Sequence, residues 1–418
     1  MTTSVIRAGG TGVAGVQTTG GDDGALSLKV GPLSTTVEAL SITSAGAATL
    51  ASTLAITGDL TANNFAGRNK IINGAMVIDQ RNAGAVISSL GAAKTYIVDR
   101  FFYQSGNAGR FSAQQNAAAV TPPEGYIKYL GFTSLGANTP ADSDYGIASQ
   151  IIEGFNTADL GWGTASAATI TISFWVRSSI TGTQSIAVVN LAGNRSYSQT
   201  YTISSANTWE QKTITITGDT TGTWPTDHTN GIMLRFALGT GANNLTSAGA
   251  WRASNSNGAT GTAAISATSG ATFYITGVQL EKSSTATEFE YRPYGTELAL
   301  CQRYLPAFSN VGNTTGNGQF PALGNGLTTT TGFLQVPFPV PARINPTGVT
   351  VSAVAHFQTG VAGATTDIVL SAIGFNQATK DACLITFTQG SATAIVDKPI
   401  GLRTNSTDAK MYFTGAEL

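Results

Sequence analysis

Apolar and polar residues alternate in short segments through the middle of this chain, and that two-residue period constrains its fold more than any other feature. Between Ile170 and Val176 every second residue is apolar, whereas Trp175 and Arg177 fall on the opposite face. Residues two apart share one face of a strand, so the pattern is typical of a β-strand with one buried side. Turn-forming residues separate further segments of this kind, at 185–191, 197–203, 210–217, 231–238 and 272–280. Strands at this spacing predict a jelly-roll β-sandwich over residues 69–295.

The last part of the chain, residues 296–418, has a different pattern. Residues 297–304 resemble a short helical connector. Glycine-rich turns then flank short apolar segments, at 333–340, 349–355, 367–372, 382–388 and 410–414. These segments predict a smaller C-terminal β-sandwich, so the expected fold class is all-β.

The first 68 residues predict no core of their own. Residues 1–34 are rich in Gly, Thr and Ser, and they are interpreted either as an attachment segment or as a flexible tail. Residues 35–68 carry a weak repeat of aliphatic residues among small polar ones. One such strand has little apolar area to bury, but three copies around an axis could bury that face in a trimeric β shaft. The alternative is a disordered linker. The shaft residues are Ile42, Leu50, Leu54, Ile56 and Leu60.

Composition excludes several classes of function. Charged residues make up 11% of the 418, and the formal net charge is −1, so nothing directs the chain to nucleic acid or to an anionic membrane. Two cysteines, Cys301 and Cys383, are too few for a disulfide framework. The sequence lacks a secretory pattern and any run of about 18 apolar residues, so we expect no membrane insertion. Assembly in a cytoplasm followed by release on lysis fits both observations.

Sequence motifs for catalysis are absent. The two histidines, His228 and His356, have no zinc-site spacing, and neither a nucleophile elbow nor a phosphate-binding loop occurs. The carboxylates that could form a glycosidase pair stand in turn-like polar segments, where aspartate usually caps a turn. They are Asp142, Asp144, Glu153, Asp219 and Asp227. The prediction is that the chain is not an enzyme.

The tryptophans are the best candidates for sugar contact, because an indole face stacks on the apolar face of a pyranose ring. Trp209 begins a predicted strand and is expected in the core. The alternative for each tryptophan is that it fills an edge of the sandwich or a subunit interface. The candidate ligand-binding residues are Trp162, Trp175, Arg177, Trp224 and Trp251.

Several long motifs in fixed order resemble those of bacteriophage tail-fibre and receptor-binding proteins. They are Val278-Gln-Leu-Glu281, Phe289-Glu-Tyr-Arg-Pro293, Glu297-Leu-Ala-Leu-Cys-Gln-Arg-Tyr304, Tyr96-Ile-Val-Asp-Arg-Phe101 and the segment from Asn69 to Asn82. The resemblance implies an adhesive fibre subunit with a carbohydrate-binding-like jelly roll. Related jelly rolls often hold a structural calcium.

The calcium that this resemblance leaves open is not expected here. The last strand reads Ile275-Thr-Gly-Val278 and lacks the aspartate that such modules often carry, so only Asp79 and Asp99 remain as ligands. We therefore expect no cofactor.

The sequence as a whole predicts a homotrimeric tail-fibre subunit. Its N-terminus would dock on phage tail or baseplate proteins, and its distal domains would bind a host surface glycan, with contact concentrated in the loops of 306–418 and the tryptophan loops second. A structural virion fibre, such as a head fibre or baseplate spike, is the first alternative. A polysaccharide depolymerase is the second.

Overall fold

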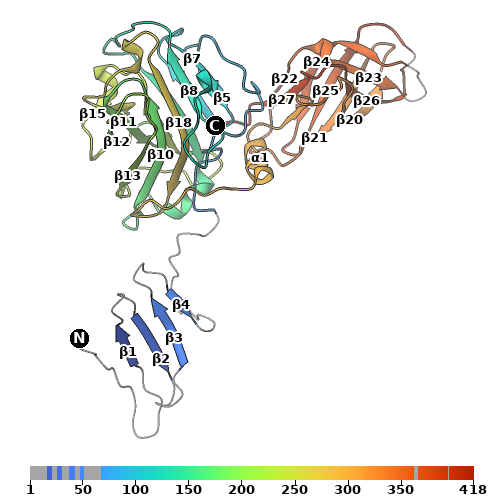
Figure 1. Ribbon diagram of the computed structural model, residues 1–418. Helices are drawn as coiled ribbons and strands as arrows, with labels where there is room; N and C mark the ends of the chain where they lie inside the picture. The colour runs from blue at the N-terminus through green and yellow to red at the C-terminus, as the bar shows by residue number, and fades with distance from the viewer. Residues whose placement is uncertain are drawn as a thin grey trace. The chain divides into compact units, whose positions relative to one another are not determined.

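The computed structural model describes residues 17–20, 26–30, 37–42, 48–50 and 67–418, apart from 362–365 and 394. The chain divides into two compact units, residues 1–63 and residues 64–418. Strands dominate both units, so the predicted all-β class is confirmed (Figure 1). The helices of the described part are too short or too polar to cross a lipid bilayer.

The N-terminal unit contains one antiparallel sheet. Its strands follow chain order and are β1 (Gln17–Gly20), β2 (Leu26–Val30), β3 (Val37–Ile42) and β4 (Ala48–Leu50). Ile42 pairs with Leu26, and Leu50 pairs with Leu40. The sheet therefore joins strands from both sides of the expected boundary at residues 34 and 35. Of the expected shaft residues, Leu54, Ile56 and Leu60 lie outside the described residues.

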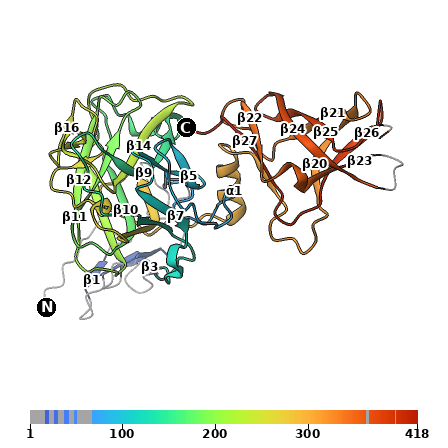
Figure 2. The same ribbon diagram turned by 90° about the horizontal axis from the view of Figure 1, so that it is seen from above.

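Residues 64–293 contain a β-sandwich of two antiparallel sheets (Figures 1 and 2). The five-stranded sheet has the spatial order β13 (Glu210–Ile216), β10 (Ile170–Ser178), β18 (Thr272–Glu281), β8 (Leu130–Ser134) and β7 (Phe111–Gln115). The seven-stranded sheet has the order β16 (Trp251–Arg252), β12 (Ser196–Ile203), β11 (Gly182–Val189), β14 (Asn230–Ala237), β9 (Gly146–Glu153), β6 (Phe101–Ser105) and β5 (Thr95–Val98).

Short elements connect these strands. A parallel ribbon forms from β15 (Leu245–Thr246) and β17 (Gly258–Ala259). The 3-10 turns of the sandwich are η1 (Ala117–Ala119), η2 (Gly154–Asn156), η3 (Ala158–Leu160), η4 (Ala242–Asn244) and η5 (Ile265–Ala267).

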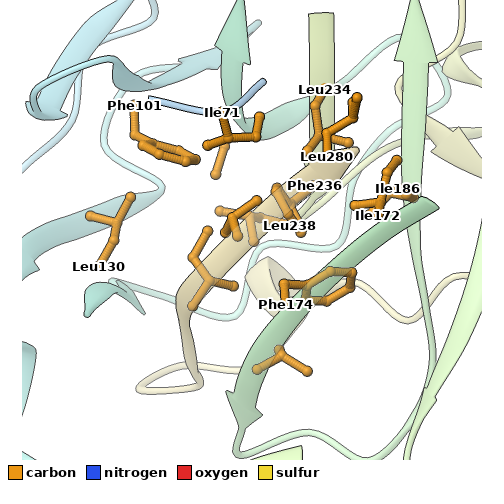
Figure 3. Close-up of a cluster of buried hydrophobic side chains, with 14 of the residues drawn as sticks. Ile71, Phe101, Leu130, Ile172, Phe174, Ile186, Leu234, Phe236, Leu238 and Leu280 are labelled. Atoms are coloured by element: carbon orange, nitrogen blue, oxygen red, sulfur yellow. The ribbon is translucent and has the colours of Figure 1, made fainter. Parts of the chain in front are cut away.

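The core of the sandwich follows from the alternation seen in the sequence. On β10 the side chains of Ile172 and Phe174 are fully buried, whereas Trp175 on the other face is only half-buried. Phe174 packs edge-to-face on Phe236 and on Tyr201, with ring centroids 5.1 and 5.2 Å apart. Figure 3 shows Ile172, Phe174 and Phe236 among the buried apolar side chains of this core. Apolar side chains of this size each stabilise the fold by about 1.5–3 kcal/mol on burial.

The motifs that resemble phage fibres meet one another in the structure. The Asn69 Oδ1 atom accepts hydrogen bonds from the amides of Ile71 and Leu280, and Arg292 donates to the carbonyl oxygens of Asn69 and Ile71. Asn73 Nδ2 donates to the carbonyl oxygen of Asp99 at 2.9 Å. Segments far apart in the chain are thus held together by side chains that satisfy buried backbone groups. These motif residues therefore maintain the fold.

The expected connector is helix α1 (Tyr294–Gln302), which begins three residues before the sequence motif. Just beyond it, Arg303 forms an ion pair with the buried Glu153, whose Oε2 also accepts a hydrogen bond from the Tyr304 hydroxyl. The buried guanidinium of Arg100 stacks 3.6 Å from the centre of the Tyr304 ring. These contacts fasten the end of the helix to the sandwich.

The C-terminal strands differ from the expected smaller sandwich. Six of them form a closed barrel, and three form a separate sheet (Figure 1). The barrel order is β20 (Gln319–Gly326), β21 (Thr331–Pro337), β25 (Ala382–Gln389), β24 (Ile368–Ala378), β23 (Phe357–Val361) and β26 (Pro399–Thr404). The sheet order is β19 (Ala307–Ser309), β27 (Lys410–Thr414) and β22 (Gly348–Val351), with a 3-10 turn η6 (Val354–His356) after β22.

Closure occurs because β26 pairs with β20 on one side and with β23 on the other, so no barrel strand keeps a free edge. Glycine permits the close strand contacts that this requires. A Cβ at Gly324 would lie 1.8 Å from the carbonyl oxygen of Phe333. The sequence showed these glycines but not which strand edges they join.

The barrel and the sandwich contact each other within residues 64–418. Arg81 forms a two-point ion pair with Glu417. Arg343 donates hydrogen bonds to the carbonyl oxygens of Ala416, Glu417 and His228. Polar side chains that bridge two folded parts in this way limit their relative motion.

Candidate functional site

Three of the five candidate ligand-binding residues come together in one cluster. The ring centroids of Trp162 and Trp224 are 4.8 Å apart, and Trp251 lies 5.2 Å from the first and 5.5 Å from the second. Tyr197 extends the group, 5.3 Å from Trp251 on the neighbouring strand. All these pairs are edge-to-face, the arrangement that the aromatic quadrupole favours. We call Trp162, Trp224 and Trp251 the tryptophan cluster.

Local structure directs these indoles inward. Trp162 follows Gly161, which has a left-handed φ of 61° and turns the chain back toward the core. Its indole N–H donates to the Ala168 carbonyl oxygen at 2.8 Å. The indole of Trp251 donates to the Thr217 carbonyl oxygen at 2.8 Å. Trp162 is 7% exposed and Trp224 is 9% exposed. These two residues follow the alternative that the sequence left open, which was to fill an edge of the sandwich.

An ion pair between Arg195 and Asp219 contacts the tryptophan cluster. Arg195 donates to both oxygens of Asp219, at 2.8 and 2.5 Å, and the Trp224 indole N–H also approaches Asp219 Oδ2, at 3.3 Å. Burial alone would raise the pKa of Asp219, but the hydrogen bonds from Arg195 and Thr221 hold that pKa below its usual value. Asp219 is therefore a carboxylate that holds Arg195 and Trp224 in place. Its oxygens already accept hydrogen bonds from protein groups.

The other two candidates, Trp175 and Arg177, lie on a different surface. They point outward from β10 in the five-stranded sheet, where Trp175 pairs with Gln211 of β13 and with Thr276 of β18. The Arg177 guanidinium lies 5.5 Å from the centre of the Tyr274 ring. Within the described part of the chain, no hydrogen bond engages the Trp175 indole. Trp175, Arg177 and Gln211 are called the Trp175 face.

Loops cover much of the remaining sandwich surface. On the seven-stranded sheet the buried Arg235 donates to Asn255, Ser256 and Asn257 at 2.7–2.8 Å, which ties residues 239–263 over that sheet. On the five-stranded sheet, Thr276 Oγ1 donates to the Lys128 carbonyl oxygen at 2.7 Å, so the chain around Lys128 lies beside the strand partner of Trp175. On this sheet Trp175 and Arg177 remain partly exposed, and Gln211 is exposed.

A second aromatic group, which the sequence analysis missed, lies beside these loops. The rings of Tyr126, Phe289 and Tyr291 pack with centroids 4.9–5.6 Å apart, and the neighbouring Ile127 is 74% exposed. Tyr291 is 59% exposed. We call these four residues the Tyr291 patch. The motif Phe289-Glu-Tyr-Arg-Pro293 contains two of them, but its pattern alone does not tell which side chains face water.

The patch and the Trp175 face are neighbours through a bulge in β18. The register slips between Ser173 and Trp175, and Gly277 takes a left-handed φ of 61° at that point. A Cβ at Gly277 would lie 2.5 Å from the Tyr126 hydroxyl oxygen. Glycine here therefore allows Tyr126 to lie directly on β18, one residue beyond the strand partner of Trp175.

The carboxylates considered for catalysis have structural partners. Asp144 accepts hydrogen bonds from Asn107 and from the Ala141 amide, and Asp227 accepts from Thr229. Glu153 binds Arg303 and Tyr304, whereas Asp142 is exposed in a turn. The described residues bring no two of these five into a shared cleft.

The two possible calcium ligands are also occupied. Asp79 accepts hydrogen bonds from the amides of Asn82 and Gly84, and Asp99 accepts two from Gln80. Burial raises the pKa of Asp99 to about 6. Among the residues that the structure describes, no group of three or more His, Cys, Asp or Glu side chains could hold a metal ion. Cys301 and Cys383 are buried, and burial raises the pKa of both thiols.

Comparison with known proteins supplies no family. Neither a family model nor a curated protein matches the chain. Among solved structures, the module CBM4 matches 50% of this chain over 98% of its own length, with 16% identity and a TM-score of 0.26. The family 11 carbohydrate-binding module of Clostridium thermocellum, in complex with a mixed-linked tetrasaccharide, matches 48% of this chain over 97% of its own, with 14% identity and a TM-score of 0.25.

The enzymatically active domain of tailspike protein 4 from bacteriophage CBA120 is also similar to this chain. The match covers 51% of this chain and 21% of the tailspike chain, with 12% identity and a TM-score of 0.26. Since these TM-scores are low, the three similarities carry no inference about ligand or activity.

Proposed function

We propose that this chain is a subunit of a bacteriophage tail fibre that adheres to the host cell surface by binding glycans. The subunit is a homotrimer in this proposal. Residues 1–34 attach it to tail or baseplate proteins, and residues 35–68 associate the three chains. It is assembled in the host cytoplasm and acts on the virion. The motifs that resemble phage fibre proteins support this identity.

The observation that carries glycan binding is the Trp175 face. It offers a partly exposed indole on the outer side of the five-stranded sheet, with Arg177 and Gln211 beside it. A pyranose ring can stack its C–H face on the indole, while guanidinium and amide groups bond to its hydroxyls. Three such sites per fibre add through effective concentration, so that weak single contacts give firm adhesion.

In this proposal the protein binds glycans and does not cleave them. A glycosidase needs one carboxyl group as acid and another as base or nucleophile on opposite sides of the scissile bond. The carboxylates considered above have other partners or lie in a turn. Release of reducing ends from host polysaccharide by the purified protein would favour the depolymerase alternative.

The test compares Trp175→Ala with Phe155→Ala, which removes another exposed aromatic ring from the sandwich. The readout is binding of the full-length protein to host surface polysaccharide by biolayer interferometry. Loss of one stacking contact should weaken binding about tenfold or more for Trp175→Ala and leave Phe155→Ala unchanged. Equal binding by both variants would contradict the site.

Two further outcomes separate the alternatives. If variants in the loop 310–318 lose binding while Trp175→Ala does not, the C-terminal domain reads the receptor. If no host polysaccharide binds the protein at all, a structural virion fibre becomes the better interpretation.

A further inference from the structure

The Tyr291 patch is the apolar surface of the sandwich that glycan binding at Trp175 leaves unexplained. Ile127 is 74% exposed and Tyr291 is 59% exposed. The Tyr291 hydroxyl donates to the Gly125 carbonyl oxygen at 2.9 Å, and the Phe289 and Tyr291 rings pack 4.9 Å apart. Rigid, exposed aromatic side chains of this kind are typical of protein interfaces, because they bury a large area at small entropic cost.

The chain enters the sandwich beside this patch. The amides of Gly67 and Asn69 donate to the two carboxylate oxygens of Glu290, at 2.5 and 2.7 Å. Arg68 donates to the Glu288 carbonyl oxygen at 2.5 Å. Glu288 and Glu290 flank Phe289, so the entry point is held directly against the patch. Gly67, Arg68, Phe289 and Tyr291 line one common groove.

We propose that the Tyr291 patch is covered by a second copy of this chain in the assembled fibre. The inference rests on the trimer of the proposed function. In a trimer that associates through residues 1–63, each sandwich is tethered to its partners at Gly67, which follows Asn63 by four residues, or at most about 14 Å of chain. The Tyr291 patch lies beside this point of entry and therefore within reach of the partner chains.

The size of the patch predicts what kind of contact it makes. A stable interface buries about 800 Å² on each partner, and one aromatic side chain contributes at most about 150–250 Å². The patch alone is therefore too small to hold free sandwiches together. Between tethered chains it suffices, since tethering raises the local concentration to about the millimolar range. The patch should strengthen and orient a trimer that residues 1–63 initiate.

The first test is disulfide trapping in the full-length protein. Ile127→Cys places a thiol on the patch, and Leu135→Cys places one on a control position that is 46% exposed. Leu135 follows the end of β8 that pairs with Thr272, at the opposite end of β18 from Leu280. The native cysteines are buried and give no background. Mild oxidation should link Ile127→Cys chains to one another and leave Leu135→Cys chains unlinked.

The second test introduces a charge at the same positions. Ile127→Asp and Leu135→Asp change exposed side chains, so both variants should fold normally, as circular dichroism will show. Loss of one buried apolar contact should make the Ile127→Asp trimer dissociate about tenfold more readily on dilution, measured by light scattering. The Leu135→Asp trimer should match the unchanged protein.

The outcomes separate this inference from the proposed function. A full-length monomer removes the trimer of the proposed function and the inference with it. A trimer whose Ile127→Cys chains do not link, and whose Ile127→Asp form dissociates normally, overturns the inference alone. A normal Ile127→Asp trimer that has lost polysaccharide binding also overturns it, because the occupant of the patch is then the glycan.

Discussion

The tryptophan cluster and the Trp175 face contain the same kinds of residue, but they occupy opposite chemical environments. In the cluster, the indole N–H groups are bonded to protein oxygens and the rings pack on one another. On the Trp175 face the indole is bonded to none of the described residues and its ring reaches solvent. Trp162 and Trp224, which stand outside the strands, are thus the buried tryptophans of this pair of regions, whereas Trp175 on β10 is partly exposed. Hydrogen-bond partners, not loop position, separate the packed indoles from the available one.

The largest expected effect is on the stability of the cluster. Trp224→Ala removes a ring that is 9% exposed and should lower the free energy of unfolding by about 3–5 kcal/mol. Trp175→Ala should change it by less, about 1 kcal/mol, since that side chain is only partly buried. Urea denaturation of both variants measures the difference. Equal losses in the free energy of unfolding would contradict the comparison, because Trp175 would then contribute as much to stability as Trp224.

The ion pair between Arg195 and Asp219 provides the next test. Asp219→Asn keeps the shape of the side chain but leaves the Arg195 charge without its partner. We expect a loss of about 1–3 kcal/mol in the free energy of unfolding, and no change in polysaccharide binding by the folded protein. Asp142→Asn, in an exposed turn, is the matched control and should have no measurable effect. If Asp219→Asn abolishes binding in a stable protein, the cluster takes part in recognition.

A smaller effect is expected where the Trp175 face meets the Tyr291 patch. Gly277→Ala puts a Cβ on a residue with φ of 61° and only 2.5 Å from the Tyr126 hydroxyl. The left-handed backbone alone should cost about 1–2 kcal/mol. Gly261→Ala is the control, because it has φ of 86° but nothing within 4 Å of the new Cβ. Weaker polysaccharide binding by the first variant alone, measured by interferometry, would show that Tyr126 shapes the Trp175 face.

The smallest effect is a dependence on pH. The pKa of Asp219 is lower in the folded protein than its ordinary value of 3.8. Its carboxylate therefore stabilises the fold above pH 3.8, and that contribution is lost as pH falls through the lower folded pKa. The stability gap between the original protein and Asp219→Asn should shrink between pH 5 and about pH 3. Glycan binding should not change between pH 7 and 5, because the Trp175 face has no side chain that titrates there. Denaturation and binding at each pH check both statements.

The sequence predicted the faces of single strands well. Ile172 and Phe174 are buried as expected, because a strand alternates its side chains whatever sheet it joins. The opposite side of β10 is exposed only in part, at Trp175 and Arg177, since Thr171 and Ser173 on that side are buried too. It also placed the connector helix close to its observed position. The C-terminal barrel was not predicted, since alternation reports the buried face of each strand and says nothing about which edges pair.

The candidate site was predicted by residue type and only partly by position. Trp162, Trp224 and Trp251 are far apart in the sequence, so their cluster could not be read from spacing. Glu290 looked like part of a family motif, and its actual partners are the amides of Gly67 and Asn69, more than 200 residues away. Tyr126 and Tyr291 were overlooked because no local pattern marks an exposed aromatic residue.

By itself, the sequence determined that this chain is built of strands, that the apolar side of β10 is buried, and that its surface carries little charge. Local side-chain alternation and composition are enough for these conclusions. The tertiary structure alone decided which tryptophans are accessible, which carboxylates are already bonded, and where exposed aromatic side chains gather. Those properties depend on contacts between segments distant in the chain, and the free energy of such contacts is not encoded in any single segment.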